Sequence, residues 1–365
     1  MTDSDDILEN LPSTTMAREK VIYEIDDDMH ERELFDRRMK ASQLFPFGIN
    51  VLDVMTSGGM EPGELVLISG KSANGKTELM TNIFQSCCEN KKRALYVGLE
   101  AKEFDIYRKL KFKAICVSRN QDPERGEFAP DPTQWGRGLR IDLDKYEDQA
   151  TERMRVFEEY GHFRPSDKGE LFSVDQILAE LEKVKDQFDI FLIDHFHMLS
   201  FGEKEYQEQS MAIKRIRQFG LRIKKPIVMA CHLRKSESKS ATLIPDRSEI
   251  MGSSDLAKVA TMIIFVEKNN ELKAKIPTNH VIGFEKTATL FRLDKFRDGG
   301  SREMFVPLVL FDSTEGRYDN SFYLGQLNSS DTEWTMTPDK YLPIWSKPHN
   351  KEYLRDFNSE EDIPF

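Results

Sequence analysis

Residues 68–79, which read ISGKSANGKTEL, constrain the fold of this chain more than any other stretch. An apolar, strand-like run ends at Gly70, and four small or polar residues lead to Gly75, Lys76 and Thr77. This spacing fits GxxxxGK[ST], in which glycines let backbone N–H groups turn around phosphate oxygens. The N-terminus of the following helix adds partial positive charge. We therefore expect a strand, a phosphate-binding loop and a helix that begins near Lys76.

The residue types of this loop predict a site for a nucleoside triphosphate. We expect Lys76 to reach the β- and γ-phosphates and Thr77 to offer its hydroxyl to Mg²⁺. A coincidental glycine-rich turn is the alternative, and the strand before it and helix after it argue against that alternative. The loop residues predicted to contact ATP, or another NTP or dNTP, are Gly70, Lys71, Ser72, Ala73, Asn74, Gly75, Lys76 and Thr77.

Strand-like and helical stretches alternate along the middle of the chain. The strand-like runs are RALYVGLE, FDIFLID, PIVMAC, TMIIFVE and ATLFRLDKFR, and helical stretches such as SVDQILAELEKVK and SMAIKRIRQFGLRIK lie between the earlier ones. Continuous apolar strands that alternate with helices are typical of a parallel sheet covered on both faces. The pattern predicts an α/β fold with a mostly parallel, twisted central sheet flanked by helices.

Bulk composition narrows the class of protein. The chain has 365 residues, 39% of them hydrophobic, and a formal net charge of -11, which argues against a globally basic nucleic-acid binder. A few Lys and Arg along a groove would still act locally, within about 8–10 Å. The four cysteines lack zinc spacing and are expected to be buried thiols in a reducing compartment. The acidic N-terminus is no signal peptide, and no stretch has the ~18 apolar residues of a membrane span, so we expect a cytoplasmic protein.

Polar side chains that follow the predicted strands complete the expected site. Asp194 ends an apolar strand, where a carboxylate would hold Mg²⁺ through water. Glu100, after another strand, is the candidate base that orients and deprotonates the attacking water. His232 follows a third strand and is the candidate hydrogen-bond donor to the γ-phosphate. The alternatives are an ordinary strand-end aspartate, a surface glutamate and a structural histidine.

His195 and His197 also suggest a metal site, because they are two residues apart beside Asp194. The sequence shows no third ligand near them, and Asp194 already has an expected role. We therefore disfavour a separate metal site at these histidines.

The motifs GKSANGKT, GLE, LIDH, CHLRK, MGSSDLAKVATMIIFVEKN and KFRDGGS, in this order, resemble a known family. The chain is similar to the RecA-type P-loop NTPase motor domain of hexameric replicative helicases. These are the DnaB-like enzymes and, closer still, the phage helicase–primases and the mitochondrial helicase twinkle. The resemblance runs from about Phe45 to Tyr323. It implies ATP hydrolysis coupled to 5′–3′ translocation of a ring, expected to be a homohexamer, on single-stranded DNA, and unwinding of the duplex.

The resemblance assigns roles to residues outside the phosphate loop. KFRDGG is similar to a hairpin that enters the neighbouring subunit's nucleotide site, which makes Arg297 an arginine finger and Lys295 its partner. A solvated β-turn is the alternative. Lys268 and Phe311 fall where the family packs residues against the base. Two basic, small-residue loops are implied to face DNA, or are merely flexible surface loops. Their candidate DNA-binding residues are Arg234, Lys235, Lys239, Gly252, Ser253, Ser254 and Lys258.

We expect three segments. Residues 1–42 form an acidic arm with a linker helix, which is either a solvated tail or docks on a neighbouring subunit. Residues 43–325 form the motor domain, with an irregular insertion at about 101–170, and residues 326–365 form a C-terminal extension. The resemblance covers only the motor, so we do not expect this chain to prime DNA synthesis.

The last six residues, EEDIPF, resemble the acidic tip of bacterial single-stranded-DNA-binding proteins. That resemblance predicts recruitment of a replisome partner, either a polymerase or a host repair protein, and a bacterial or phage-infected bacterial cell. A disordered solubilising tail is the alternative. The residues predicted to bind the partner are Asp362, Ile363, Pro364 and Phe365.

Two other functions share the phosphate loop. One is a RecA- or RadA-like recombination ATPase that forms filaments, and the other is a replisome regulator that binds nucleotide without unwinding DNA. The hairpin that contains Arg297 favours the ring helicase over the filament-forming ATPase, which would lack it.

Overall fold

The computed structural model describes residues 27–100, 104–126, 130–165, 172–234, 242–252, 254–277, 286–296, 300–313 and 316–346. The chain divides into two compact units, residues 1–42 and 43–365. The described part of the first unit, residues 27–42, lies entirely in helix α1 (Asp27–Gln43). Its polar surface includes an i,i+4 ion pair between Glu33 and Arg37, while Phe35 is exposed.

In the part of the chain that the structure describes, nine strands form one sheet in the order β3-β2-β4-β5-β1-β6-β7-β8-β9. The strands from β3 to β6 pair in parallel, and β7, β8 and β9 extend the sheet through antiparallel pairs. This confirms the predicted α/β fold with a mostly parallel central sheet. The strands are β1 (Leu65–Ser69), β2 (Ala94–Gly98), β3 (Gly161–Arg164), β4 (Ile190–Asp194), β5 (Ile227–Cys231), β6 (Met262–Lys268), β7 (Lys286–Phe296), β8 (Leu308–Asp312) and β9 (Arg317–Tyr323).

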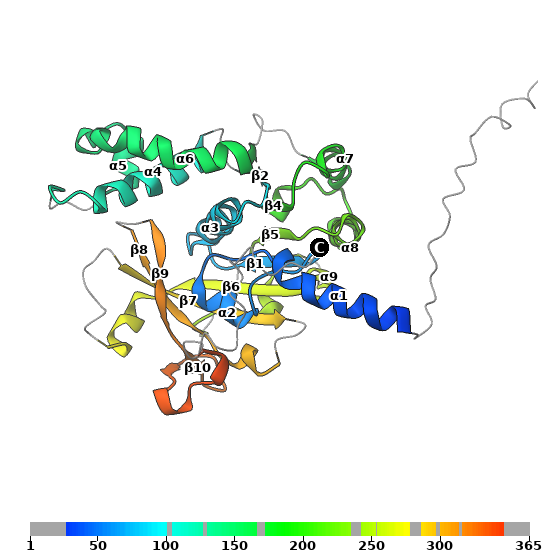
Figure 1. The fold of residues 1–365 in the computed structure, drawn as a ribbon. Helices are drawn as coiled ribbons and strands as arrows, with labels where there is room; N and C mark the ends of the chain where they lie inside the picture. The colour runs from blue at the N-terminus through cyan, green and yellow to red at the C-terminus, as the bar shows by residue number, and fades with distance from the viewer. Residues whose placement is uncertain are drawn as a thin grey trace, which may run out of the picture. The chain divides into compact units, whose positions relative to one another are not determined.

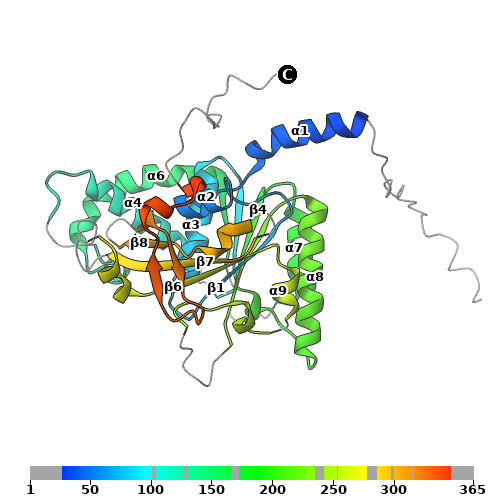
Figure 2. The same cartoon turned by 90° about the horizontal axis from the view of Figure 1, so that it is seen from below.

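Helices cover both faces of this sheet (Figures 1 and 2). Helix α3 packs on one face with α4 and α6 outside it, and α7 and α8 pack on the other. Alternate residues of each strand enter the two cores, so Val66 and Ile68 face α3 while Leu65 and Leu67 face α8. The helices after α1 are α2 (Asn50–Met55), α3 (Lys76–Glu89), α4 (Asp105–Asn120), α5 (Pro132–Gly136), α6 (Glu147–Tyr160), α7 (Val174–Val184), α8 (Glu205–Ile223) and α9 (Asp255–Val259).

The segment predicted as an irregular insertion is more regular than expected. Its described residues hold α4, α5, the 3-10 helix Ile141–Tyr146, α6 and strand β3, which forms one edge of the sheet. The prediction rested on the polar stretch between α4 and α6, which contains Gly and Pro, whereas α4 and α6 themselves contain neither residue. The segment therefore forms a helical layer over α3 (Figure 1).

The segment predicted as a C-terminal extension begins with a small hairpin. Strands β10 (Gly325–Leu327) and β11 (Trp334–Met336) pair antiparallel. Trp334 is fully buried, and its indole Nε1 donates a 2.8 Å hydrogen bond to the carbonyl oxygen of Val306. This part of the extension is thus anchored to the motor, and residues 347–365 lie outside the described residues.

A helix that spans a lipid bilayer must be both long and apolar. Within the described ranges, none of the helices could cross a membrane.

Candidate nucleotide-binding and catalytic site

The phosphate loop joins the end of β1 to the start of α3, as predicted. A Cβ at Gly70 would lie 2.4 Å from the carbonyl oxygen of Val266, so only glycine fits where the loop passes strand β6. Gly75 caps α3 with φ +98°, a left-handed conformation that glycine adopts without strain. Ser72 and Ala73 are exposed, which leaves the loop accessible to a ligand.

Lys76 is buried at the base of the loop. Its Nζ donates to the carbonyl oxygens of Gly70 at 2.9 Å and Lys71 at 3.1 Å. Burial lowers the pKa of this ammonium, and the nearby carboxylates of Asp194 and Glu100 partly oppose that shift. The ammonium is thus held inside the loop by acceptors that a phosphate oxygen can replace.

Asp194 collects hydrogen bonds from two elements. Its Oδ2 accepts from the Thr77 hydroxyl at 3.0 Å and from the Tyr96 phenol at 2.6 Å. Burial, and then the Asp194 carboxylate, raise the pKa of Tyr96, so the phenol stays a donor. Sequence reasoning missed Tyr96, whose place in the apolar run RALYVGLE gave no sign that it would bond to a second strand's carboxylate.

Glu267 at the end of β6 is a second residue that the sequence did not reveal. Its Oε1 lies 3.2 Å from the Nζ of Lys71, and burial raises the pKa of this carboxyl. The pair ties the phosphate loop to the neighbouring strand. Residue type alone did not distinguish Glu267 from the other charged residues in this part of the sequence.

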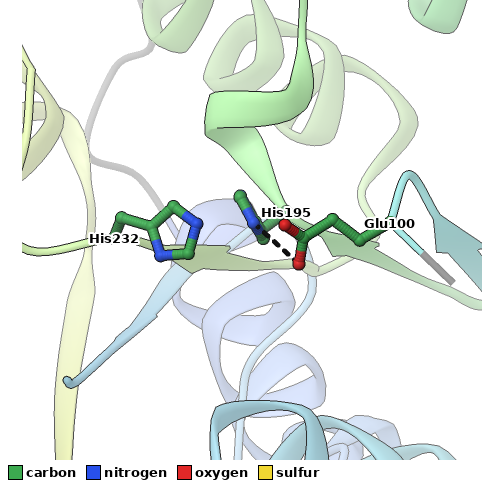
Figure 3. Close-up of side chains that lie close together, drawn as sticks. All are labelled: Glu100, His195 and His232. Atoms are coloured by element: carbon green, nitrogen blue, oxygen red, sulfur yellow. Dashed lines mark ion pairs between the residues drawn. The ribbon is translucent and has the colours of Figure 1, made fainter. Parts of the chain in front are cut away.

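Glu100 and His232 lie together beyond the ends of β2 and β5, with His195 between them (Figure 3). His195 Nε2 lies 3.1 Å from Glu100 Oε2, and the ring centroids of His195 and His232 are 3.8 Å apart. His195 is only 2% exposed, whereas the Glu100 side chain is 54% exposed. Burial lowers the pKa of His232, and His195 and Lys76 lower it further.

His197 has a different setting. Its Nε2 lies 3.0 Å from the Met251 carbonyl oxygen, and its Nδ1 accepts from the backbone N–H of His232 at 3.2 Å. Burial lowers the pKa of His197 to about 4, which keeps the ring neutral. Both nitrogens are therefore engaged in joining β5 to the segment around Met251.

The two residues predicted near the base, Lys268 and Phe311, both lie close to Tyr318. The Lys268 side chain runs beside Gly75, where the Tyr318 hydroxyl also approaches. Phe311 packs edge-on against Tyr318, with ring centroids 5.1 Å apart.

Phe311 also lines a cavity of about 220 Å³ together with Phe112, Trp135 and Glu78. Burial raises the pKa of Glu78, but the Lys113 and Lys109 ammoniums together oppose it and hold this pKa below its usual range.

The predicted arginine-finger hairpin is described in part. Lys295 near the end of β7 donates to the carbonyl oxygens of Ala257 at 3.0 Å and Lys258 at 2.8 Å, at the C-terminus of α9. Arg297 lies outside the described residues. In its own subunit Lys295 therefore stabilises α9, and its role toward a neighbour stays a prediction.

The two loops predicted to face DNA lie against each other. Arg234 donates its backbone N–H to Glu249 at 2.8 Å and its guanidinium to Gly252 at 3.0 Å. Arg234, Ser254 and Lys258 line one cavity of about 220 Å³, and the same cavity is lined by Arg247 and Ser248, which sequence reasoning missed. The cavity thus concentrates basic and hydroxyl side chains.

Several predicted residues lie outside the ranges that the structure describes. They are Lys235, Lys239, Ser253, Arg297, Asp362, Ile363, Pro364 and Phe365.

Comparison with known proteins identifies a matching family model. The model "DnaB-like helicase C terminal domain" matches residues 45–308, which is most of the chain. That range contains the phosphate loop, Asp194, Glu100 and His232.

Curated relatives include replicative DNA helicase DnaB of Helicobacter pylori strain 26695, 24% identical over 247 residues, which cover 66% of this chain and 47% of the relative. DnaB of Mycoplasma genitalium is 21% identical over 326 residues, which cover 84% of this chain and 63% of the relative. The chain thus spans about half to three fifths of the length of the curated relatives that it matches.

Solved structures show the same fold. One of them, an isolated ATPase domain, has a TM-score of 0.53 at 14% identity, covering 87% of this chain and 100% of that chain. "The Structure Of A DnaB-Like Replicative Helicase And Its Interactions With Primase" also has a TM-score of 0.53 at 14% identity, covering 86% of this chain and 67% of that one. The predicted RecA-like architecture is confirmed. Since the family model matches well over half of its length, this chain belongs to the DnaB-like helicase C-terminal domain family.

Proposed function

We propose that this chain is the motor of a ring-forming replicative helicase that hydrolyses ATP, translocates 5′–3′ on single-stranded DNA and unwinds duplex DNA. The observation that carries the proposal is the 3.0 Å hydrogen bond from Thr77 to Asp194 in a chain of the DnaB-like family. This bond brings together the phosphate loop after β1 and the acidic end of β4, the two parts that a magnesium nucleotide requires.

The residues present fit Mg²⁺. Asp194 offers a buried carboxylate and Thr77 a hydroxyl, and Mg²⁺ prefers oxygen ligands together with substrate phosphates. Thr77 would hold the ion directly and Asp194 would hold it through water. When bound, Mg²⁺ would neutralise charge on the β- and γ-phosphates.

The chain's own side chains would carry out the remaining chemistry. Lys76 would exchange its bonds to the Gly70 and Lys71 carbonyls for bonds to phosphate oxygens. Glu100 would orient a water and accept its proton as the water oxygen bonds to the γ-phosphorus and the bridging bond to ADP breaks. His232, on the neighbouring loop, would donate a hydrogen bond to the γ-phosphate.

Coupling to a ring requires contacts between subunits. Arg297 would enter the adjacent subunit's pocket and offset transition-state charge, an effect worth about 10³–10⁵ in rate for arginine fingers. Lys295, two residues earlier, would place this hairpin. Nucleotide turnover would then depend on the neighbour, as a hexamer that steps along DNA needs.

The basic loops would track the DNA backbone. Arg234, Ser254 and Lys258 line one cavity, which supports a phosphate contact that does not read bases. Lys235, Lys239 and Ser253 belong to the same loops in sequence, and Gly252 lies beside Arg234. We assign this surface to single-stranded DNA in the channel of the ring.

The tail and the setting complete the proposal. The tail would recruit a replisome protein or another protein that binds single-stranded-DNA-binding proteins. That partner would bury the Phe365 ring and pair its basic residues with the tail's carboxylates. The residues assigned to this contact are Asp362, Ile363, Pro364 and Phe365. The protein would act at a replication fork in a bacterial or phage-infected bacterial cell.

Unwinding of a forked DNA by the purified chain tests the function. The wild-type chain should separate the strands in the presence of ATP and Mg²⁺. The Lys76→Ala variant should neither separate the strands nor hydrolyse ATP. Electron microscopy of the active species should show rings. Filaments together with strand exchange would instead indicate a recombination ATPase, and nucleotide binding with no unwinding would indicate a regulator. Either outcome would overturn the helicase proposal.

A further inference from the structure

Glu100, His195 and His232 come from three different loops and converge at one point (Figure 3). Each offers one ligand atom, a carboxylate oxygen or an imidazole nitrogen, and the three atoms lie within 4.8 Å of one another. The order β2-β4-β5 explains the convergence, because adjacent parallel strands end at the same edge of the sheet. Glu100 and His232 are 132 positions apart in the sequence.

The central residue of this group is buried and incompletely bonded. His195 is 2% exposed, and among the residues that the structure describes neither its Nδ1 nor its Nε2 has a hydrogen-bond partner, although Nε2 lies 3.1 Å from Glu100 Oε2. A buried imidazole nitrogen without a partner is unfavourable, because it has lost its hydrogen bonds to water. His197, in contrast, uses both ring nitrogens. The sequence showed no further ligand near His195 and His197. The fold brings Glu100 and His232 to His195, and His197 is not part of this group.

We propose that Glu100, His195 and His232 form a binding site for a transition-metal ion of the Zn²⁺ or Co²⁺ class. Two imidazoles and one carboxylate, with a fourth position open to water, are a ligand set that zinc uses in proteins. Nitrogen ligands favour such ions over Mg²⁺, which prefers oxygen. The site is therefore chemically distinct from the oxygen-rich position between Thr77 and Asp194.

The site requires only a small movement to close. Ligand atoms about 2.0–2.2 Å from a tetrahedral ion stand roughly 3.4 Å apart, so atoms that lie within 4.8 Å of one another need to approach by at most about 1.4 Å. Glu100 can make this movement because its side chain is 54% exposed. The imidazole rings of His195 and His232 already lie edge to face, with centroids 3.8 Å apart.

Binding of the ion would inhibit hydrolysis, and this consequence rests on the proposed function. The ion would hold the Glu100 carboxylate as a ligand, and a carboxylate held in this way could not accept a proton from water. It would also occupy His232, the candidate donor to the γ-phosphate. Zn²⁺ would thus inhibit hydrolysis by occupying Glu100 and His232, without displacing Mg²⁺.

Cobalt provides a direct probe of the site. The untagged, chelator-treated full chain would be titrated with Co²⁺ in excess Mg²⁺ and without nucleotide, and visible d–d absorption would be followed. We expect the spectrum of a four-coordinate nitrogen and oxygen site at one ion per chain. Zn²⁺ should displace the cobalt, because Zn²⁺ binds such ligands more tightly than Co²⁺.

Variants separate this site from others. Glu100→Gln keeps the size of an exposed side chain and should weaken Co²⁺ binding at least about tenfold, since loss even of an outer partner costs 10–100-fold. His232→Ala should have a similar effect, and His162→Ala, which removes an exposed imidazole on β3, should have none. A cobalt spectrum that survives both Glu100→Gln and His232→Ala, or the absence of binding to the folded wild type, would overturn the proposal.

The ATPase assay keeps the two proposals distinguishable. If wild type hydrolyses ATP and binds no cobalt, the metal site is wrong and the helicase proposal stands. If cobalt binds in the expected way and no ATP is hydrolysed under any DNA condition, the metal site stands and the helicase proposal fails. When both hold, Zn²⁺ at stoichiometric concentration should slow hydrolysis in excess Mg²⁺, and a chelator should restore it.

Discussion

The Tyr96 phenol donates a 2.6 Å hydrogen bond to the Oδ2 atom of Asp194, the same oxygen that accepts from Thr77. Tyr96 is fully buried and lies on β2, while Asp194 ends the adjacent strand β4. The bond holds the candidate magnesium carboxylate in place from a neighbouring strand. Tyr96 is therefore a positioning residue for a group that the sequence did identify.

Replacement of Tyr96 by Phe tests this positioning role. Phe keeps the packed ring and removes the donor to Asp194, so the fold should persist and the Mg²⁺ concentration for half-maximal ATPase activity should rise roughly tenfold or more. The matched control is Tyr206→Phe on the exposed face of α8. A Tyr96→Phe enzyme with an unchanged Mg²⁺ requirement would mean that Thr77 alone orients the carboxylate.

Mixing two inactive variants tests whether sites are shared between subunits. Lys76→Ala removes the phosphate-loop ammonium, and Arg297→Ala removes the candidate finger, so each alone should lose DNA-stimulated ATPase activity by about 10³-fold. In mixed rings some pockets would combine an intact Lys76 with a neighbour's intact Arg297. Partial recovery of activity on mixing is expected, and a simple average of two inactive enzymes would argue that Arg297 acts within its own subunit.

Removal of one lysine charge from the cavity that Arg234 and Lys258 line tests the proposed DNA-binding surface. Lys258 is 71% exposed and lines the cavity with Arg234 and Arg247. Lys258→Gln should weaken binding of single-stranded DNA for all sequences alike. It should also reduce the slope of log K against log salt by about 0.7, the value for one phosphate contact. Fluorescence anisotropy across a salt series measures both, and Lys183→Gln on α7, also exposed, is the control that should change neither.

The pH dependence of stability tests the environment of Asp53. Burial raises the pKa of this carboxyl from 3.8 to about 7, although the backbone N–H groups of Phe47 and Gly48 donate to it and oppose the shift. Between these values the folded chain holds a proton that the unfolded chain has released. The contribution of Asp53 to the free energy of unfolding is therefore full below about pH 4 and falls as the pH rises toward about 7.

Asp53→Asn removes this titration, so urea unfolding at several pH values should show a flatter decline over that range. Asp148→Asn on the exposed surface of α6 is the control and should leave the slope unchanged. A variant whose stability declines as steeply as that of wild type would show that Asp53 ionises at its ordinary pKa.

Deletion of residues 360–365 tests the tail. The truncated chain should keep wild-type ATPase and unwinding activity and should fail to capture replisome proteins from a bacterial extract in a quantified pull-down. Phe365→Ala should reproduce most of the loss, because a buried aromatic anchor carries much of such an interface. Ser359→Ala is the matched control. Equal capture by the truncated and full chains would contradict the proposed recruitment.

Much of the fold was readable from local pattern. Val66, Leu67 and Ile68 form a continuous apolar run, which is typical of a strand buried on both faces. Gly70 and Gly75 are positions where the backbone geometry admits little else. Helices α4 and α6 near residues 101–170 were not predicted, although they contain neither Pro nor Gly, because the polar stretch between them, which does contain Pro and Gly, dominated the interpretation of the segment.

The sequence by itself determined the phosphate loop, the strand that leads to it and the acidic end at Asp194, because these depend on residues a few positions apart. Only the tertiary structure decided that Tyr96 bonds to Asp194 and that Glu100, His195 and His232 meet. Those contacts depend on the order of strands β2, β4 and β5 in the sheet. Strand order is set by the packing of the whole domain, and no local pattern of side chains records it.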